Sequence, residues 1–418
     1  MAKSLTDNQM IPSAMETAFQ IQDLVTMFLH RVPHVDHENI SRVCSQWRNI
    51  VTDNSGFLQW RRESEWDEPL LLVFKATEVE DEDDDDDEDN SDSEDEVDEG
   101  FQSVVRLVDP GTGRWRSVAP LPQPRLDHCS AFVGGALYTI GGCDASYKPQ
   151  GYVHRYDVMT DTWTECAPLN EVRTGACCGV VGGGIVVAGG WCGGSHLSSV
   201  EFYDPQTNTW EFREPMSSAR GWANACVLPG AKGFEIKSTD RLCMLGGVAD
   251  DVGSNNDFAE VYDPVKDKWT VLPRAATSVT GGRSMHPLAH PRSGLVLMGL
   301  GAGSEEESST EFPPVTAVVL DESASSKRNT SKNPAPCWRE LDGGMHEHGD
   351  KLNISKGGVS TCLALDAHRS VVLSHVADDV VNQVSLNLLL DLRSNTMTAA
   401  PWSLPMAGTG LSCAVVRL

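Results

Sequence analysis

The stretch YDPQTNTW, residues 203–210, has the composition of a polar turn between two strands, and it recurs along the chain. Close copies begin at Tyr156 and Tyr262, and looser copies begin at Leu107, Leu320 and Leu389. The six copies are spaced by 48, 47, 59, 69 and 59 residues, counted at Trp115, Trp163, Trp210, Trp269, Trp338 and Met397. A repeat of near fifty residues that carries short strands predicts the blades of a β-propeller.

Each copy predicts a particular turn. The Asp that follows the first aromatic or aliphatic residue can accept hydrogen bonds from the next backbone N–H groups, which opens a turn. In five of the six copies, the fifth position counted from this Asp is a residue type that tolerates positive φ, and we expect a left-handed residue there. These positions are Gly113, Asp161, Asn208, Asp267 and Asn395. The Trp then starts the returning strand, and we expect it to pack between blades rather than to bind a ligand.

The upstream half of each unit contains an apolar strand, which ends in paired glycines in three units and has drifted in the others, at 70–76, 296–301 and 371–376. Examples are ALYTIGG at 136–142, IVVAGG at 185–190 and RLCMLGG at 241–247, each preceded by another apolar strand. The double glycine with spaced Tyr and Trp resembles the kelch repeat family. A phosphate-binding glycine loop is the rival reading, but no GK[ST] follows the glycines and the strands do not lead into helices.

The first unit lacks an inner strand, while LSCAVVRL at 411–418 is an inner strand with no followers. Joining the two in one blade leaves no open sheet edge at the seam. The sequence therefore predicts a mainly β fold, a six-bladed kelch-type β-propeller over residues 67–418 closed by strand 411–418.

Charge is concentrated in one segment. The chain has a formal net charge of −27, and residues 78–100 contain 17 acidic side chains, so the remainder carries −10. We expect residues 77–101 to be a disordered acidic insert and 322–337 to be a second, low-complexity insert. Ser91 and Ser93 precede acidic residues and are candidate phosphorylation sites. The negative balance argues against nucleic acid as a partner.

Other classes of protein fit the sequence less well. The uncharged run 176–194 is too rich in glycine for a membrane span and matches two strands of the repeat. Five of the twelve cysteines fall in inner strands of the repeat, no CxxC pair occurs and no secretion signal is visible, so we expect reduced thiols in the cytoplasm or nucleus. The HxH at His346 and His348 is weak evidence for metal, and no cofactor, metal or catalytic residue is predicted.

Residues 1–66 read as a small helical domain, with apolar residues at helical spacing before Pro33 and again after Asp36, a predicted N-cap. The stretch 28–62, with "RVP" and "VCxxWR", is similar to an F-box, and an F-box followed by kelch repeats resembles the plant F-box/kelch proteins. The resemblance implies a non-catalytic substrate receptor of a Skp–cullin–F-box ubiquitin ligase. It implies adaptor-facing residues at Leu24, Phe28, Val32, Pro33, Ile40, Val43, Cys44, Trp47 and Ile50. The alternatives are a helical cap on the propeller and an interaction scaffold without ligase function.

In a four-stranded blade, the loops from strand 2 to 3 and from strand 4 to 1 lie on one face, called the loop face below. Four arginines precede inner strands at corresponding places, and we expect them to ring the channel mouth on this face. They are Arg125, Arg173, Arg220 and Arg283. The resemblance implies that they grip an acidic target; the alternative is that each pairs with a neighbouring blade. We further hypothesise that the acidic insert, which we expect on the same face, mimics such a target.

Overall fold

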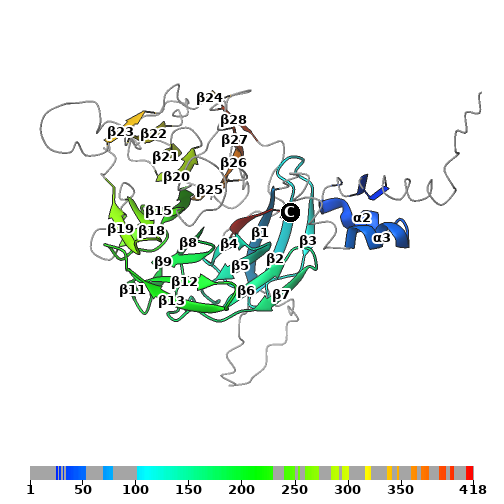
Figure 1. Cartoon of the computed structure of the whole chain (residues 1–418), viewed down its shortest axis with the longest axis horizontal. Coiled ribbons are helices and arrows are strands. Elements are labelled where there is room, and N and C mark those ends of the chain that lie inside the picture. The colour runs from blue at the N-terminus through cyan, green and yellow to red at the C-terminus, as the bar shows by residue number, and fades with distance from the viewer. Residues whose placement is uncertain are drawn as a thin grey trace, which may run out of the picture. The chain divides into compact units, whose positions relative to one another are not determined.

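The structure is a computed structural model. In the N-terminal part it describes residues 25–26, 28–29, 32 and 34–52. Further along the chain it describes residues 69–78, 101–228, 240–249, 253–254 and 259–272, and the strands given below that follow residue 283. The chain divides into two compact units, Met1–Glu68 with Leu418 and Pro69–Arg417. Figure 1 shows the helices in the first unit and the sheets in the second.

The N-terminal unit contains a short 3-10 helix, η1 (His34–Asp36), followed by α2 (His37–Ser41) and α3 (Ser45–Thr52). The spacing predicts one helix from Asp36 onward, but the backbone breaks between α2 and α3, where the N–H of Val43 bonds to the carbonyl of Ile40. Asp36 stands at the N-cap position of α2 without a capping side-chain hydrogen bond, which corrects the predicted role of that carboxylate. Leu29, Val35 and Val51 are buried.

The second unit is built from antiparallel sheets of consecutive strands. The first three sheets in order are β29 (Leu411–Arg417), β1 (Pro69–Glu78), β2 (Phe101–Val108) and β3 (Trp115–Val118); β4 (Cys129–Val133), β5 (Ala136–Ile140), β6 (Val153–Asp157) and β7 (Thr162–Glu165); and β8 (Cys177–Val181), β9 (Gly184–Ala188), β12 (Val200–Asp204) and β13 (Thr209–Arg213).

The later sheets follow the same order. They are β14 (Asn224–Leu228), β15 (Arg241–Leu245), β18 (Ala259–Asp263) and β19 (Lys268–Val271); β20 (Ser284–His290), β21 (Gly294–Leu300), β22 (Thr316–Asp321) and β23 (Cys337–Glu340); and β25 (Val359–Ala364), β26 (Arg369–His375), β27 (Leu386–Asp391) and β28 (Thr396–Ala399), with the parallel β24 (His346–Glu347) at the edge. Two small hairpins extend loops: β10 (Trp191–Cys192) with β11 (Ser195–His196), and β16 (Val248–Ala249) with β17 (Gly253–Ser254).

The inner strands adjoin one another in the cyclic order β29, β4, β8, β14, β20, β25 and back to β29. Figure 1 shows the resulting mainly β, propeller-like arrangement. The strand β29 pairs with β1 from Pro69↔Arg417 to Lys75↔Leu411, so the C-terminal segment lies beside the first strand of this unit. Successive sheets bury apolar side chains between them, for example Ile140, Val187 and Tyr203 in one cluster.

The repeated turn has the predicted geometry in every copy that the structure describes. Asp109, Asp157, Asp204 and Asp263 each accept a backbone N–H two residues on. The fifth position has positive φ at Gly113, Asp161, Asn208 and Asp267, while Asn395 lies outside the described residues. Local side-chain chemistry therefore sets this turn.

In three sheets, the Trp of the repeat fastens the sheet to the preceding one, whereas Trp115 is 47% exposed, contrary to the packing that the repeat predicts. The indole Nε1 of Trp210 donates to the carbonyl oxygen of Ala167 at 2.8 Å. The Oδ1 of Asn208 in turn accepts the backbone N–H of Ala167 at 2.9 Å and the hydroxyl of Tyr203 at 2.8 Å. Trp163 and Trp269 repeat the indole bond to Ala119 and Glu214, which confirms their packing role between blades and adds hydrogen bonds that the sequence does not show.

Candidate functional site

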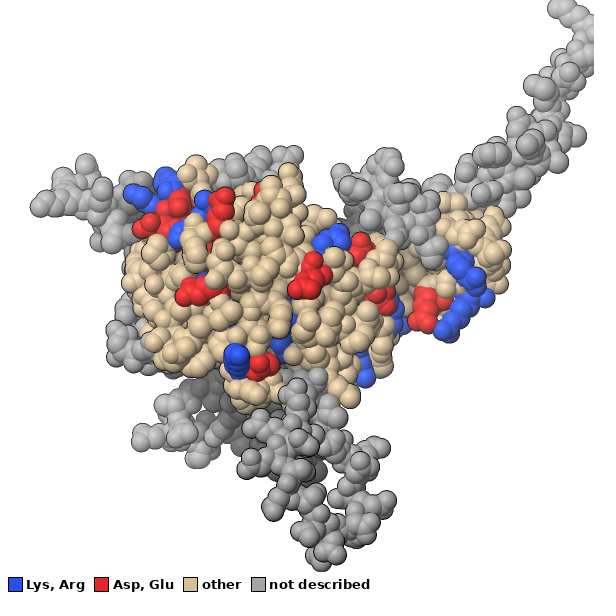
Figure 2. Space-filling view, turned by 90° about the horizontal axis from the view of Figure 1, so that it is seen from below, with Lys and Arg blue, Asp and Glu red and all other residues tan. Residues whose placement is uncertain are grey.

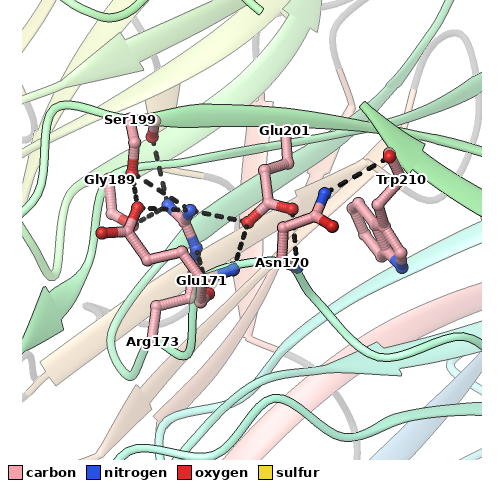
Figure 3. A network of polar contacts seen from close by, with 7 residues as sticks. All are labelled: Asn170, Glu171, Arg173, Gly189, Ser199, Glu201 and Trp210. Atoms are coloured by element: carbon pink, nitrogen blue, oxygen red, sulfur yellow. Dashed lines mark hydrogen bonds and ion pairs between the residues drawn. The ribbon is translucent and has the colours of Figure 1, made fainter. Parts of the chain in front are cut away.

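Arg173 follows the loop that leads into β8, and its side chain is fully buried in its own sheet (Figure 3). Its guanidinium donates to Glu201 Oε1 at 2.8 Å, to the Gly189 carbonyl at 2.8 Å and to the Ser199 carbonyl at 3.1 Å. Glu201 lies in β12 with no exposed surface, so the ion pair joins the loop to the second and third strands. A charge-assisted bond away from water fixes this loop firmly.

The carboxylate of Glu201 also holds the loop backbone. Its Oε2 accepts the N–H of Asn170 at 2.9 Å, and its Oε1 accepts the N–H of Glu171 at 3.2 Å (Figure 3). One buried side chain thus satisfies two loop amides and one guanidinium, which offsets much of the cost of burying a charge.

Arg220 repeats the arrangement in the next sheet. It is 1% exposed and forms a short ion pair with the buried Glu260 of β18, and Glu260 also accepts the N–H of Ser217 at 3.0 Å. Burial lowers the pKa of Arg220, while Glu260 opposes that shift. Glu201 and Glu260 occupy the same position, the second residue of the third strand.

The double glycines of the repeat bind the main chain at these arginines. The N–H of Gly190 donates to the Arg220 carbonyl at 2.9 Å, and Gly142 donates in the same way to Arg173. Gly189 has φ of +67°, and a Cβ there would lie 2.4 Å from the Arg220 carbonyl oxygen. Only glycine fits this close approach, so the paired glycines of one sheet seat the arginine of the next.

Arg125 is equally buried but has a different partner, because His154 stands where the other sheets have Glu. Its guanidinium lies 3.2 Å from His154 Nδ1 and donates to Thr139 Oγ1 at 3.0 Å and to the Thr139 carbonyl at 3.2 Å. Burial lowers the pKa of Arg125 to about 10. Burial, with the charge of Arg125, lowers the pKa of His154 to about 4. Asn170 and Ser217 each lie three residues before the arginine of their loop and donate a backbone N–H to the buried carboxylate. The residue at the same place before Arg125 is Pro122, which has no N–H to donate.

These contacts correct the interpretation that the arginines grip a target. Arg125, Arg173 and Arg220 are no more than 3% exposed, and the guanidinium of each is bonded to the second or third strand of its own sheet. The spacing of the arginines marks a repeated position, but their guanidinium groups bond to partners on the second and third strands. Arg283 lies outside the described residues, as do Ser91 and Ser93.

Acid is expected to destabilise the second unit through His154. Its pKa of about 4 lies below the ordinary 6.5, so the unfolded chain takes up a proton before the folded chain does. The contribution of the neutral His154 to the free energy of unfolding is therefore complete above pH 6.5 and is lost as the pH falls toward 4. His128, whose pKa burial lowers to about 3, acts in the same direction.

Urea unfolding at pH 7 and pH 5 measures this contribution. The variant His154→Gln lacks the titrating ring but keeps His128, so its loss of stability over this interval should be smaller than that of the parent by roughly 2 kcal/mol. Equal losses in the two chains would show that His154 does not titrate in this way.

The loop face carries a set of residues that sequence reasoning missed. Asp127, Gly175 and Trp222 each stand two residues after one of the three arginines, and all have positive φ. The N–H of Gly175 donates to the Asp127 carbonyl at 3.0 Å, and the N–H of Trp222 donates to the Gly175 carbonyl at 2.7 Å. The sequence contains one signal of this set: the aromatic Trp222 stands at the repeat position that Asp127 and Gly175 hold in the two preceding sheets.

The N-terminal unit leaves several predicted adaptor-facing residues exposed. Phe28 is 67% exposed and Val43 is 60% exposed. Cys44 is also exposed, and the residues with intermediate exposure are Val32, Ile40, Trp47 and Ile50. Leu24 and Pro33 lie outside the described residues. Large apolar side chains open to solvent on so small a unit are available to a partner.

Some kinds of site are not found in the described part of the chain. None of its helices is long and apolar enough to cross a membrane, and no group of three His, Cys, Asp or Glu side chains there could hold a metal ion. The ten cysteines that are described are free thiols. On the face drawn in Figure 2, basic and acidic side chains occur in small mixed groups among uncharged ones.

Two protein-family models match the chain. The F-box domain model matches residues 22–58, and the model of the KLHDC2/KLHL20/DRC7 Kelch-repeats domain matches residues 94–299. The first match covers α2 and α3, and the second covers the sheets with the repeated turn and the buried arginines.

Individual relatives agree with these matches. Kelch-like protein 36 of Bos taurus is 28% identical over 177 residues, which is 41% of this chain and 20% of that protein, so this chain matches only a fifth of its length. An F-box/kelch-repeat protein of Arabidopsis thaliana is 25% identical over 285 residues, 67% of this chain and 66% of that protein. A solved structure of YjhT has a TM-score of 0.48 and 15% identity, and covers 72% of this chain and 94% of that one. The two family-model matches give this chain an F-box domain at residues 22–58 and kelch repeats at residues 94–299.

Proposed function

We propose that this chain is the substrate-recognition subunit of a Skp–cullin–F-box ubiquitin ligase and that it is not itself catalytic. The observation that carries the proposal is an F-box domain at residues 22–58 ahead of kelch repeats at 94–299 in one polypeptide. The F-box docks on the Skp adaptor, and the propeller binds a target protein for ubiquitination and degradation in the cytoplasm or nucleus.

The exposed apolar side chains of the N-terminal unit support adaptor docking. Phe28 and Val43 are too exposed to serve the core of their own unit, which Leu29, Val35 and Val51 supply. A stable interface needs apolar anchors of this kind at its centre. Leu24, Val32, Pro33, Ile40, Cys44, Trp47 and Ile50 complete the proposed adaptor surface.

We infer that the propeller has six blades. The sheet order and the cyclic neighbourhood of the inner strands support this count, and β29 supplies the inner strand of the first blade. In such a ring, the loop face is free of the repeated Asp turns and is the surface that we assign to the target.

Replacing Val43 by Glu is expected to weaken binding of a recombinant Skp adaptor by at least about tenfold, because a charge would enter an apolar contact. The full chain and the variant are compared by isothermal titration calorimetry. Val265→Glu is the matched control, since Val265 is 67% exposed in a turn of the second unit and should leave the affinity unchanged.

Absence of adaptor binding by the parent chain would contradict the proposal and would favour the alternative, a kelch scaffold whose F-box is vestigial. Equal affinity of parent and Val43→Glu would remove this residue from the docking surface.

A further inference from the structure

Trp222 is held in an unusual backbone conformation on the loop face. Its φ is +50°, in the left-handed region that bulky side chains rarely adopt, and its side chain is 46% exposed. A bulky residue in that region is strained, and such strain gathers at functional sites. The backbone hydrogen bond to Gly175 and the bridge between Gly221 and Val248 maintain this conformation.

The indole of Trp222 spans three successive sheets. Its Nε1 donates to Asp127 Oδ2 at 3.0 Å, although the two residues lie 95 positions apart in sequence. It passes over Gly175, where an added Cβ would lie 2.6 Å from the ring. The His196 ring packs edge-on against it, with centroids 5.9 Å apart. The orientation of the indole is therefore fixed before any partner arrives, which lowers the entropic cost of binding.

We call Asp127, His196, Trp222 and Val248 the Trp222 patch. Val248 is 40% exposed, and its backbone pairs with that of Gly221, the residue before Trp222. Exposed apolar side chains rimmed by a carboxylate are typical of a protein-binding surface.

The charges at the patch favour a basic partner. Asp127 is exposed, so the carboxylate that orients the indole can also accept a bond from a partner. Cys143 bridges Leu126, which places Asp144 in the adjoining segment, but the Asp144 carboxylate already accepts bonds from Ser146, Lys148 and Gln150. The arginines of the same loops are buried and engaged, so they do not present positive charge.

An electron-rich indole face beside a carboxylate is a recognised arrangement for binding a cation, since the ring attracts the charge and the carboxylate pairs with it. The formal net charge of −27 steers basic partners toward the chain in addition. We propose that the Trp222 patch recognises an arginine or lysine side chain presented by the target protein. This inference rests on the proposed function, and it replaces the expected acidic target with a basic one.

The purified full chain is panned against a random heptapeptide library displayed on phage. Recovered peptides should be enriched in Arg or Lys relative to the unselected library. The most enriched peptide is then synthesised and its affinity is measured by fluorescence polarisation. Trp222→Ala should weaken binding roughly tenfold. Asp127→Asn should also weaken it, because Asn tolerates the same positive φ and can accept the indole bond but carries no charge.

Trp115→Ala is the matched control. Trp115 is 47% exposed and follows the turn at Asp109, away from the patch in sequence and on the returning strand β3. This change should leave peptide affinity unaltered. Thermal unfolding of each variant reports whether it folds, and Asp127→Asn keeps the test valid should Trp222→Ala fail to fold.

Enrichment of acidic peptides, or recovery of peptides without a basic preference, would overturn the inference. Affinity that survives both Trp222→Ala and Asp127→Asn would overturn it as well. None of these measurements involves the Skp adaptor, so failure here leaves adaptor binding by the F-box unaffected and separately measurable.

Discussion

A chain that lacks residues 411–418 is expected to lose the native fold of its second unit and to accumulate in the insoluble fraction. The missing segment contains β29, which pairs with β1 along its whole length and adjoins β4 on one side and β25 on the other. Without β29, the edge of β1 is open. An open, apolar strand edge is a template for aggregation.

The expected loss is comparable to the whole stability of a domain. In the intact sheet, Leu70, Leu71 and Leu72 of β1 have no exposed surface. Ala414 and Val416 of β29 are also buried. Fully burying one aliphatic side chain is worth about 1.5–3 kcal/mol, whereas a domain is stable by only about 5–15 kcal/mol. Exposing several of them is enough to unfold the unit.

Solubility, size-exclusion chromatography and hydrogen exchange at β1 measure this outcome. Removal of Leu418 alone is the control, because β29 ends at Arg417 and this shorter deletion leaves the pairing intact. A soluble chain lacking 411–418 with parental hydrogen-exchange protection at β1 would show that the pairing contributes little to the fold.

The parts of the fold that the sequence predicted are those that local chemistry determines. Asp204, Asn208 and Trp210 form a turn whose hydrogen bonds and positive φ depend on residues within the phrase itself. The paired glycines are equally predictable, because their positive φ and the close approach of another backbone exclude residues with a Cβ. The repetition then predicts the propeller-like architecture, since the copies share the same turn between two strands.

The candidate site was less predictable because it depends on distant partners. The repeated arginines mark a fixed position, but their orientation is decided by Glu201 and Glu260, which lie 28 and 40 residues further on. A Glu within an apolar strand at the same place in two repeats was the available signal. Trp222 is similar, because its indole is oriented by Asp127 from another sheet. The break between α2 and α3 was missed since spacing alone does not show where a helix ends.

The buried ion pair leads to the second large expected effect. Replacing Glu201 by Ala should destabilise the second unit by about 3–5 kcal/mol, because Arg173 would lose its buried carboxylate at 2.8 Å and keep the longer contact of 3.3 Å to Glu171, whose side chain is 35% exposed. Two loop amides, those of Asn170 and Glu171, would lose their acceptor at the same time. Glu201→Gln should cost less, since an amide oxygen can still accept from Arg173 and from the loop.

Glu211→Ala is the matched control for urea unfolding. Glu211 forms an ion pair with Arg213 at 3.0 Å, but its side chain is 65% exposed, and a surface pair of this kind is worth about 0–1 kcal/mol. A cost for Glu201→Ala no larger than that for Glu211→Ala would mean that Arg173 finds water or another acceptor when its partner is removed. The arginine would then be able to leave its sheet and reach a ligand on the loop face, as the sequence first suggested. A cost of several kcal/mol would instead tie each arginine to the scaffold and leave the exposed residues of the loops to recognise the target.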